Sequence, residues 1–169
     1  FRRVLFRSAA VCAMRGMTVT LQDQDAARLA PAMGRAQALF KRRLRDRDRV
    51  RDATDRLIPD TRGDGARRAD VVIEAIFENL QAKRELFARL ETITRPGAIL
   101  ASNTSSLKLA DIGTALANPA RLVGIHFFNP VPQMQLVEIV SGDGTDPQVA
   151  QQAAAFVRAI DKLPLPVKD

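Results

Sequence analysis

The chain contains a single histidine, His126, in the segment GIHFFNPVPQMQLVEIV, which also carries the acidic residue Glu138. Both residues lie in apolar runs typical of strands, and a turn-rich link joins the two runs. If the strands are neighbours, the carboxylate can orient the imidazole and raise its basicity, as in a general acid/base pair. Asn129, in the link, could then orient a carbonyl or hydroxyl group. The alternative is a packed histidine, because titratable side chains often have purely structural positions.

A second polar group is the segment ASNTSSL, residues 101–107, which contains five consecutive small polar residues. It lies between an apolar, strand-like run and a segment with helical spacing. Residues of this kind cap helices on structural grounds alone. Five in succession exceed what one cap requires, so a polar ligand is the alternative explanation for some of them.

A third candidate is Asp23, which ends the strand-like run MTVTLQD after a helix-like segment, AAVCAMRG. In a dinucleotide-binding βαβ unit, an acid at this place accepts hydrogen bonds from the adenosine ribose and disfavours a 2′-phosphate, which favours NAD over NADP. A turn or cap aspartate is the structural alternative. The same unit needs a first strand and a glycine-rich turn for the pyrophosphate. The segment FRRVLFRSAAV has no glycine and three arginines, so we expect that strand and turn to be missing or replaced.

The elements that must position these residues alternate along the chain. Apolar runs predict strands at residues 17–23, 69–77, 98–102, 121–128 and 135–142, with a proline-containing edge strand at 162–169. Helices are expected at residues 24–49, 79–90, 106–116 and 146–160, and a loop with Pro59, Gly63 and Gly65 follows the first. This alternation predicts an α/β, doubly wound, mostly parallel sheet. Ligands bind at the carboxyl ends of such strands, where the polar residues are Asp23, Glu78, residues 102–106 and His126.

Composition excludes several classes of protein. The apolar fraction is 46% and the charged fraction is 27%, as in globular proteins. No run approaches the ~18 apolar residues of a membrane span, so we expect no membrane association. A single cysteine, Cys12, excludes an internal disulfide and favours a reducing, intracellular compartment. One histidine and one cysteine also make a His/Cys metal site an unsuitable explanation.

The net charge of +7 is concentrated in residues 41–56, which carry eight basic and four acidic groups. Basic helices bind nucleic acid, but interleaved aspartates and the absence of Tyr and Trp favour a solvated helix face instead. We therefore expect no nucleic-acid partner. A third explanation is that this segment meets a small polyanion, such as the phosphates of a coenzyme.

Three stretches, ADVVIEAIFENLQAKRELF, ILASNTSSLKLADI and GIHFFNPVPQMQLVEIV, closely resemble the NAD-binding domain of 3-hydroxyacyl-CoA dehydrogenases. The resemblance covers about residues 9–169, and it implies a Rossmann-like fold and the oxidation of (S)-3-hydroxyacyl-CoA by NAD⁺ in fatty-acid β-oxidation. It implies that His126 is the base that takes the 3-hydroxyl proton and that Glu138 is its partner. Ser105 and Asn129 would hold the substrate oxygen and the nicotinamide region.

The resemblance also implies a set of cofactor and substrate contacts. Asp23 would bind the adenosine ribose, and Glu78 and Lys83 would lie along the NAD cofactor. The long helix after Asp23 contacts coenzyme A in this family. This would explain the basic residues Lys41, Arg42 and Arg45, without indicating which of them reaches a phosphate.

Two departures from the family qualify this expectation. Residues 1–8, FRRVLFRS, stand where the family has its first strand and Gly-x-Gly-x-x-Gly turn, so we expect them to be foreign sequence and residues 9–169 to be an incomplete NAD-binding domain. The family's C-terminal helical domain, which closes the substrate site and forms the dimer, is expected to be absent. The parent would be a cytoplasmic bacterial enzyme, either a homodimer or part of a multifunctional complex.

Two hypotheses for the chain remain. In the first, it is the cofactor domain of an NAD-dependent 3-hydroxyacyl-CoA dehydrogenase, with weak or no activity of its own. In the second, it is a non-catalytic, dehydrogenase-like binding domain that has lost the cofactor phosphate site. In either case a missing central strand leaves two sheet edges unpaired, and the segment RRVLF could partly fill that gap with Val4, Leu5 and Phe6 as the inserted apolar residues.

Overall fold

The computed structural model describes residues 2–169. The strands are β1 (Val19–Gln22), β2 (Leu57–Asp60), β3 (Val71–Glu74), β4 (Ile99–Ser102), β5 (Leu122–Phe127), β6 (Leu136–Ser141) and β7 (Leu163–Lys168). The α-helices are α1 (Arg2–Met14), α2 (Ala26–Arg43), α3 (Arg47–Arg56), α4 (Leu80–Ile93), α5 (Leu109–Gly113) and α6 (Pro147–Ala159). Short 3-10 helices, η1 (Asp64–Arg68) and η2 (Pro119–Arg121), precede β3 and β5.

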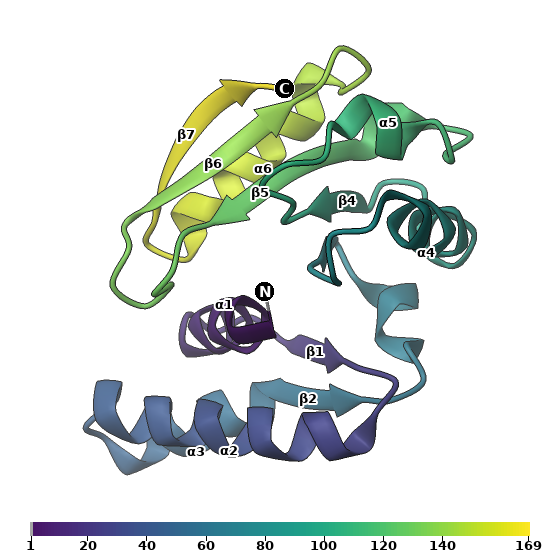
Figure 1. The fold of residues 1–169 in the computed structure, drawn as a ribbon. Coiled ribbons are helices and arrows are strands. Elements are labelled where there is room, and N and C mark those ends of the chain that lie inside the picture. The colour runs from purple at the N-terminus through teal and green to yellow at the C-terminus, as the bar shows by residue number, and fades with distance from the viewer. Residues whose placement is uncertain (1) are drawn as a thin grey trace.

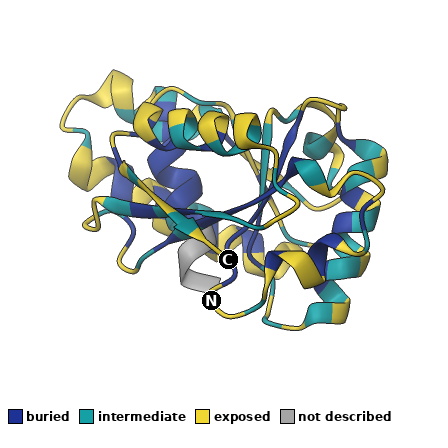
Figure 2. Cartoon of the chain, turned by 90° about the horizontal axis from the view of Figure 1, so that it is seen from above, coloured by how far each residue is buried: buried dark blue, intermediate teal, exposed yellow. Residues whose placement is uncertain are grey.

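The predicted α/β, mostly parallel architecture is confirmed (Figure 1). One sheet has the order β3-β4-β5-β6-β7, in which only the β5–β6 pair is antiparallel. Helices cover both of its faces: α6 packs on one through Ala153 and Val157, and α4 and α5 pack on the other through Phe87 and Ile112. Figure 2 shows this layering, with buried strands between helices whose outer faces are exposed. The proline-containing strand β7 is at the sheet edge, as expected.

The strands β1 and β2 form a separate two-stranded parallel sheet. Among residues 2–169, no strand pairs with the inner edge of β1 or of β3, so the expected break in the sheet is present. The consequence is visible in burial. All four residues of β4 are buried, whereas Val71, Val72 and Ile73 of β3 are only half-buried. Val19 of β1 and Val71 and Ile73 of β3 are partly buried and pack against the cluster that contains Val11 and Cys12 of α1.

The segment RRVLF does not replace the missing strand, because it lies in α1. The spacing of buried residues explains the outcome. Phe6, Ala9, Ala10 and Ala13 recur every three or four positions and pack together against α2, which is the pattern of one helix face. The Arg35 guanidinium of α2 lies 4.7 Å from the centre of the Phe6 ring.

Two further expectations for the segment after Asp23 are corrected. The single helix predicted at residues 24–49 is two helices, α2 and α3, because Asp46 caps α3 by accepting hydrogen bonds from the N–H groups of Asp48 and Arg49. The predicted loop around Pro59 contains β2. A proline is tolerated there because β2 is an edge strand. Asp146 caps α6, with its Oδ1 accepting a hydrogen bond from the Gln148 N–H at 2.8 Å.

The remaining elements agree with the expected positions, apart from their exact ends. Asn79 caps α4, with its side-chain oxygen accepting a hydrogen bond from the Ala82 N–H. Gly16, with a φ of +90°, ends the turn after α1. None of the helices in residues 2–169 combines the length and apolar character needed to cross a membrane.

Candidate active site

His126 and Glu138 lie directly opposite each other on the antiparallel strands β5 and β6. The imidazole Nδ1 is 2.8 Å from Glu138 Oε2, which confirms that the two strands are neighbours and that the side chains meet. The bond to a carboxylate favours the proton on Nδ1 and leaves Nε2 as the basic nitrogen. The side chains of His126 and Glu138 are only 19% and 28% exposed, so the pair is shielded from bulk water without being closed off.

Strand alternation determines the face on which this pair lies. Ile125, Phe127, Val137 and Ile139 point into the core beneath α6, so His126 and Glu138 point to the opposite face. There they line a pocket of about 260 Å³ whose walls are residues 104–109, Gly124, His126, Glu138, Val140 and residues 167–169. A Cβ on Gly124 would lie 2.7 Å from the Val140 Cβ, so a glycine is required for these strands to pack as they do.

The pocket brings Ser105 together with His126 and Glu138, but not all predicted residues join them. Ser105 is exposed at the pocket wall. Asn129 is exposed in the link after β5, where the Asn129–Pro130 peptide bond is cis, and it is not among the pocket residues. The nearest ring to the imidazole is that of Phe128, which meets it edge-on at a centroid distance of 4.8 Å.

Hydrogen bonds to Glu78 and to the end of β5 hold the loop that carries Ser105. Glu78 Oε1 accepts from the Thr104 hydroxyl at 2.7 Å and from the Ser105 N–H at 2.9 Å. Asn103 Oδ1 accepts from the Phe127 N–H at 2.9 Å, which ties the loop to the end of β5. Most of the small polar residues of ASNTSSL therefore have structural partners. Thr104, Ser105 and Ser106 all line the pocket, and the hydroxyl groups of Thr104 and Ser106 donate to Glu78 Oε1.

The predicted cofactor residues Glu78 and Lys83 lie behind this loop. The Lys83 ammonium is fully buried, 2.7 Å from Glu74 Oε1 and 3.1 Å from Glu78 Oε2. Glu74, which the sequence analysis passed over, accepts a further hydrogen bond from the Ser102 hydroxyl at 2.7 Å. Its only sequence signal is an acid inside the apolar run VVIEAIF. Lys83 therefore acts on the loop through its two carboxylate partners, Glu74 and Glu78.

A second residue absent from the sequence predictions, Lys162, fixes the link between β5 and β6. Its buried ammonium donates to the carbonyl of Val131 at 2.8 Å and to that of Met134 at 2.6 Å. Because this link contains Asn129 and joins the strands that carry His126 and Glu138, Lys162 restrains the chain next to that pair. Burial lowers the pKa of the Lys162 ammonium, and the charges of Arg15 and Arg43 lower it further.

The electrostatic state of Glu78 leads to a pH-dependent prediction. Burial alone would raise its pKa, but the Thr104 hydroxyl, the Ser105 N–H and Lys83 stabilise the carboxylate and hold the pKa below its ordinary value of 4.5. A lowered pKa in the folded state contributes stability above the unfolded pKa, and that stability is lost as the pH falls through the folded value. We therefore expect the Ser105 amide to exchange hydrogen faster, relative to β5 amides, below about pH 4.5.

The matched variant for this prediction is Glu78→Gln, in which the titrating group is absent. Hydrogen exchange measured by NMR between neutral and acidic pH should show the extra acid sensitivity of Ser105 in the parent and not in the variant. Equal acid sensitivity in both proteins would show that Glu78 does not control the loop.

Asp23 directly follows β1, at the carboxyl end of that strand. Its Oδ1 accepts a hydrogen bond from the Asp25 N–H at 3.0 Å, and Arg28 lies 3.9 Å away. The side chain is 36% exposed, so the carboxylate has a local turn contact and still faces solvent. It has the position and the acceptor capacity that a ribose diol requires.

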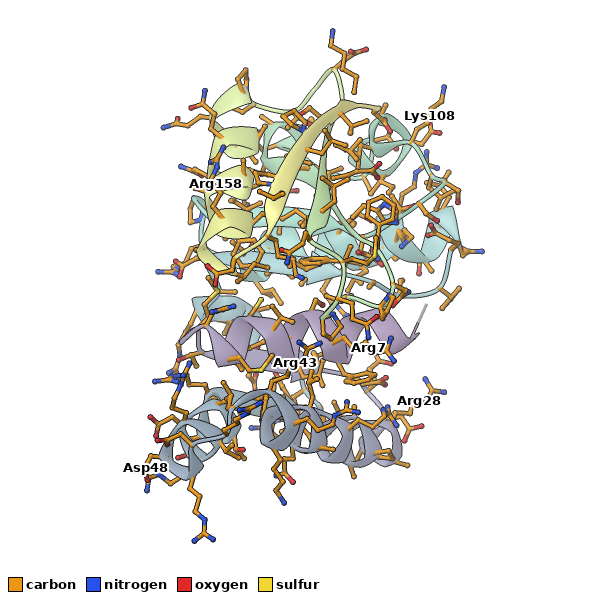
Figure 3. The ribbon with its side chains drawn as sticks, turned by 90° about the vertical axis from the view of Figure 1, so that its left-hand side faces the viewer. Arg7, Arg28, Arg43, Asp48, Lys108 and Arg158 are labelled. Carbon is orange, nitrogen blue, oxygen red and sulfur yellow. The ribbon has the colours of Figure 1, made fainter. Side chains whose placement is uncertain are left out.

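Lys41, Arg42 and Arg45 are exposed around the C-terminal end of α2. Lys41 and Arg45 line a separate shallow pocket of about 310 Å³ with Arg47. At a rise of ~1.5 Å per residue, roughly 22 Å of helix separate them from the start of α2 beside Asp23. Figure 3 shows Lys108, which lines the His126 pocket, and Asp48, in the first turn of α3, at opposite ends of the molecule. The structure therefore does not bring these basic residues to the His126–Glu138 pair.

A dinucleotide has three parts to be bound here: the adenosine ribose, the pyrophosphate and the reactive nicotinamide end. The residues of this chain suit the first and the last. Asp23 suits the adenosine ribose, and the pocket at Ser105 and His126 suits the reactive end. The glycine-bearing turn beside Asp23 does not suit the pyrophosphate, because the N–H groups of Gly63 and Gly65 each donate to Asp60 at 2.8 Å.

Comparisons with known proteins agree with this geometry. Residues 6–169 match the protein family described as "3-hydroxyacyl-CoA dehydrogenase, NAD binding domain". The 3-hydroxyadipyl-CoA dehydrogenase of Escherichia coli is 37% identical over 161 residues, which are 93% of this chain and 34% of that protein. The fatty acid oxidation complex subunit alpha of Shewanella amazonensis is 34% identical over 155 residues, covering 89% of this chain and 22% of that subunit.

The fold comparison gives a similar result. The crystal structure of 3-hydroxybutyryl-CoA dehydrogenase from Escherichia coli superposes with a TM-score of 0.93 at 35% identity, covering 96% of this chain and 35% of that one. The chain thus spans about a third or less of the length of these relatives.

Proposed function

The chain belongs to the family of 3-hydroxyacyl-CoA dehydrogenase NAD-binding domains, and on this premise we propose that the whole protein oxidises (S)-3-hydroxyacyl-CoA to 3-oxoacyl-CoA with NAD⁺. The observation that carries the proposal is the His126–Glu138 pair, with 2.8 Å between Nδ1 and Oε2, in a pocket shared with Ser105. A histidine oriented by a carboxylate is the arrangement that removes a hydroxyl proton. The proposed setting is fatty-acid oxidation.

The chemistry divides between cofactor and protein. When bound, NAD⁺ supplies the nicotinamide that accepts hydride from C3 of the substrate. His126 Nε2 takes the proton of the 3-hydroxyl group, and Glu138 stabilises the imidazolium that forms. The Ser105 hydroxyl is assigned to the substrate oxygen, and Asn129 to the same oxygen or to the nicotinamide region. Glu78 and Lys83 support the cofactor side of the pocket through the Ser105 loop.

The substrate's other end and the protein's partners are further parts of the proposal. Lys41, Arg42 and Arg45 would meet coenzyme A phosphates, because their charge is concentrated at one helix end and coenzyme A is long enough to extend away from the reacting carbon. The similarity to a fatty acid oxidation complex subunit supports a parent that is either a homodimer or part of a multifunctional assembly. We place this parent in the bacterial cytoplasm.

A second candidate function is a dehydrogenase-like binding domain without catalysis. The observation that favours it is the glycine-bearing turn beside Asp23, whose amides are already bonded to Asp60. Weak cofactor binding follows from either candidate, so we expect low activity from this chain. The catalytic proposal requires that NADH and acetoacetyl-CoA react on it, whereas the binding proposal does not.

The test is NADH oxidation by acetoacetyl-CoA with the chain in excess over NADH, which compensates for weak binding. Slow NADH loss above the protein-free rate, with formation of 3-hydroxybutyryl-CoA, is the expected result. NADH loss no faster than the protein-free rate, with no 3-hydroxybutyryl-CoA formed, would contradict the proposal and favour the binding domain.

Asp23 provides a prediction about cofactor choice. We expect Asp23→Ala to raise the dissociation constant for NADH by about tenfold, because a hydrogen bond to a charged acceptor is lost. The affinity for NADPH should fall less, because the carboxylate no longer repels its 2′-phosphate. Fluorescence titration with both nucleotides measures the two constants.

The matched control is Asp25→Ala, which removes a nearby carboxylate that caps α2 through the Ala27 N–H. It should affect the two nucleotides equally. An Asp23→Ala variant with an unchanged NADH to NADPH ratio would show that Asp23 is only a turn residue.

A further inference from the structure

Three charged residues form a buried triad at the junction of β3 and α4: Glu74, Glu78 and Lys83. The side chains of Glu74 and Lys83 are 0% exposed. Glu74 ends β3, Lys83 lies in the first turn of α4, and Glu78 lies in the connection between these elements. The triad takes no direct part in the proton transfer proposed above.

Burial of full charges is costly, and a hydrophobic pair of similar volume is often as stable or more stable. Packing of α4 against the sheet therefore does not by itself require an ion pair at this place. The apolar residues Phe87 and Leu90 of α4 already pack there with Leu100 of β4. The hydrogen bonds that Glu74 and Glu78 accept from the loop after β4 indicate the role of the buried charges.

Two routes from Lys83 converge on the loop that follows β4. In the first, Glu74 Oε2 accepts from the Ser102 hydroxyl at 2.7 Å, and Ser102 Oγ in turn accepts from the Thr104 N–H at 3.3 Å. In the second, Lys83 holds Glu78, whose Oε1 accepts from the Thr104 hydroxyl and the Ser105 N–H. Both ends of the short segment before Ser105 are thus tied to one ammonium group.

We propose that Glu74 is a positioning residue, which acts through Lys83 and Ser102 to hold Ser105 at the wall of the His126 pocket. Glu74 Oε1 also accepts from the Ile76 N–H at 2.6 Å, so the same carboxylate fixes the start of the connection that carries Glu78. Without Glu74, Lys83 has one carboxylate partner in the triad, and the Ser102 hydroxyl loses its acceptor. The part of this inference that concerns ligand affinity rests on the proposed function.

The decisive variant is the double replacement Glu74→Leu with Lys83→Met, which removes both fully buried charges together. We expect its melting temperature to stay close to that of the parent, because no buried charge is left without a partner except the half-buried Glu78. Hydrogen exchange at the Ser105 amide, measured by NMR relative to β5 amides, should be about tenfold faster. The conservative variant Glu74→Gln, which keeps the shape of the side chain, should show a smaller change in the same direction.

The control is Arg121→Met, which removes another buried cation that contacts the opposite end of β4. Arg121 donates to the carbonyls of Ala98 and Arg95 at 3.0 and 2.6 Å. This variant should lower the melting temperature without changing the relative exchange at Ser105. If the triad is purely structural, Ser105 exchange should be unchanged in both Glu74 variants. That result would overturn the proposal.

Affinity is measured separately, so that the two proposals can fail independently. If the parent binds NADH, the double variant should bind about tenfold more weakly at an equal melting temperature. Faster Ser105 exchange in a protein that does not bind NADH at all supports the positioning role and contradicts the proposed function. Unchanged Ser105 exchange in the double variant, in a protein that binds NADH normally, contradicts the positioning role and leaves the proposed function standing.

Discussion

Replacing His126 with glutamine is expected to lower the rate constant for NADH-dependent reduction of acetoacetyl-CoA by about 10²- to 10⁴-fold, the usual contribution of a general acid or base. Glutamine keeps a hydrogen-bonding group opposite Glu138 but has no nitrogen that takes or gives a proton near neutral pH. In the reductive direction, the imidazolium must give its Nε2 proton to the oxygen of the substrate. The variant retains binding groups and loses this step.

Single-turnover kinetics with the chain in excess measures the effect. The melting temperature should change little, because His126 lies at a pocket and not in the core beneath α6. The matched control is Glu138→Gln, which keeps the histidine and removes the charge that orients it and stabilises the imidazolium. We expect a loss smaller than that of His126→Gln. An unaltered rate in the His126 variant would exclude the histidine as the proton donor.

Replacing Lys83 alone with methionine is expected to lower the free energy of unfolding by about 3–5 kcal/mol, as is typical when one partner of a buried ion pair is removed. The two carboxylates then face each other without a counter-charge, and the side chain of Glu74 has no exposed surface. This is a large fraction of the ~5–15 kcal/mol that stabilises an ordinary domain. The unpaired edges of β1 and β3 are expected to lower the free energy of unfolding further.

Denaturant unfolding at neutral pH measures this loss. Adding Glu74→Leu to the same chain should restore most of it, because the newly uncompensated charge is removed with its partner. Arg84→Met is a suitable control. Arg84 is adjacent in sequence, and its guanidinium donates from the surface to the Asp111 carbonyl. A Lys83 variant as stable as this control would contradict the account of the buried triad.

The parts of the site that the sequence predicted are those carried by strand pattern and close spacing. His126 and Glu138 lie on two apolar runs joined by a short link, so their pairing follows from the antiparallel neighbours that such a link produces. The polar segment after β4 was found in the same way, because strand ends in parallel sheets converge. Each of these predictions depends on local pattern and one general rule of topology.

The triad was not predictable in this way. Ser102 is 28 residues from Glu74 and Lys83 is nine residues from it, and neither residue type signals burial. An acid inside an apolar strand shows only that some partner must exist. Which partner is used depends on how α4 returns across β3 and β4, a tertiary arrangement that hydrophobic spacing leaves open.

The errors in the fold have equally specific causes. The strand β2 is four residues long and contains Pro59, and its residue Ile58 is exposed, so no apolar alternation marks it. The break between α2 and α3 lies in a run of alternating Arg and Asp, where a cap aspartate cannot be told from a surface one. In α1, the three arginines of the first turns make the segment look polar. Phe6 and the alanines of α1 form one apolar helix face, and this face is recognisable only when α2 packs against it.

We propose that Asp23, Ser105 and His126 lie along one NAD-binding surface, with the His126–Glu138 pair at its reactive end. The most direct test is an NMR titration of the isotope-labelled chain with NADH at concentrations high enough to populate a weak complex. The account predicts saturable shift changes at the amides of Asp23, Ser105 and His126, with little change at the basic end of α2. No saturable changes at these three positions, or changes confined to residues 41–47, would contradict it.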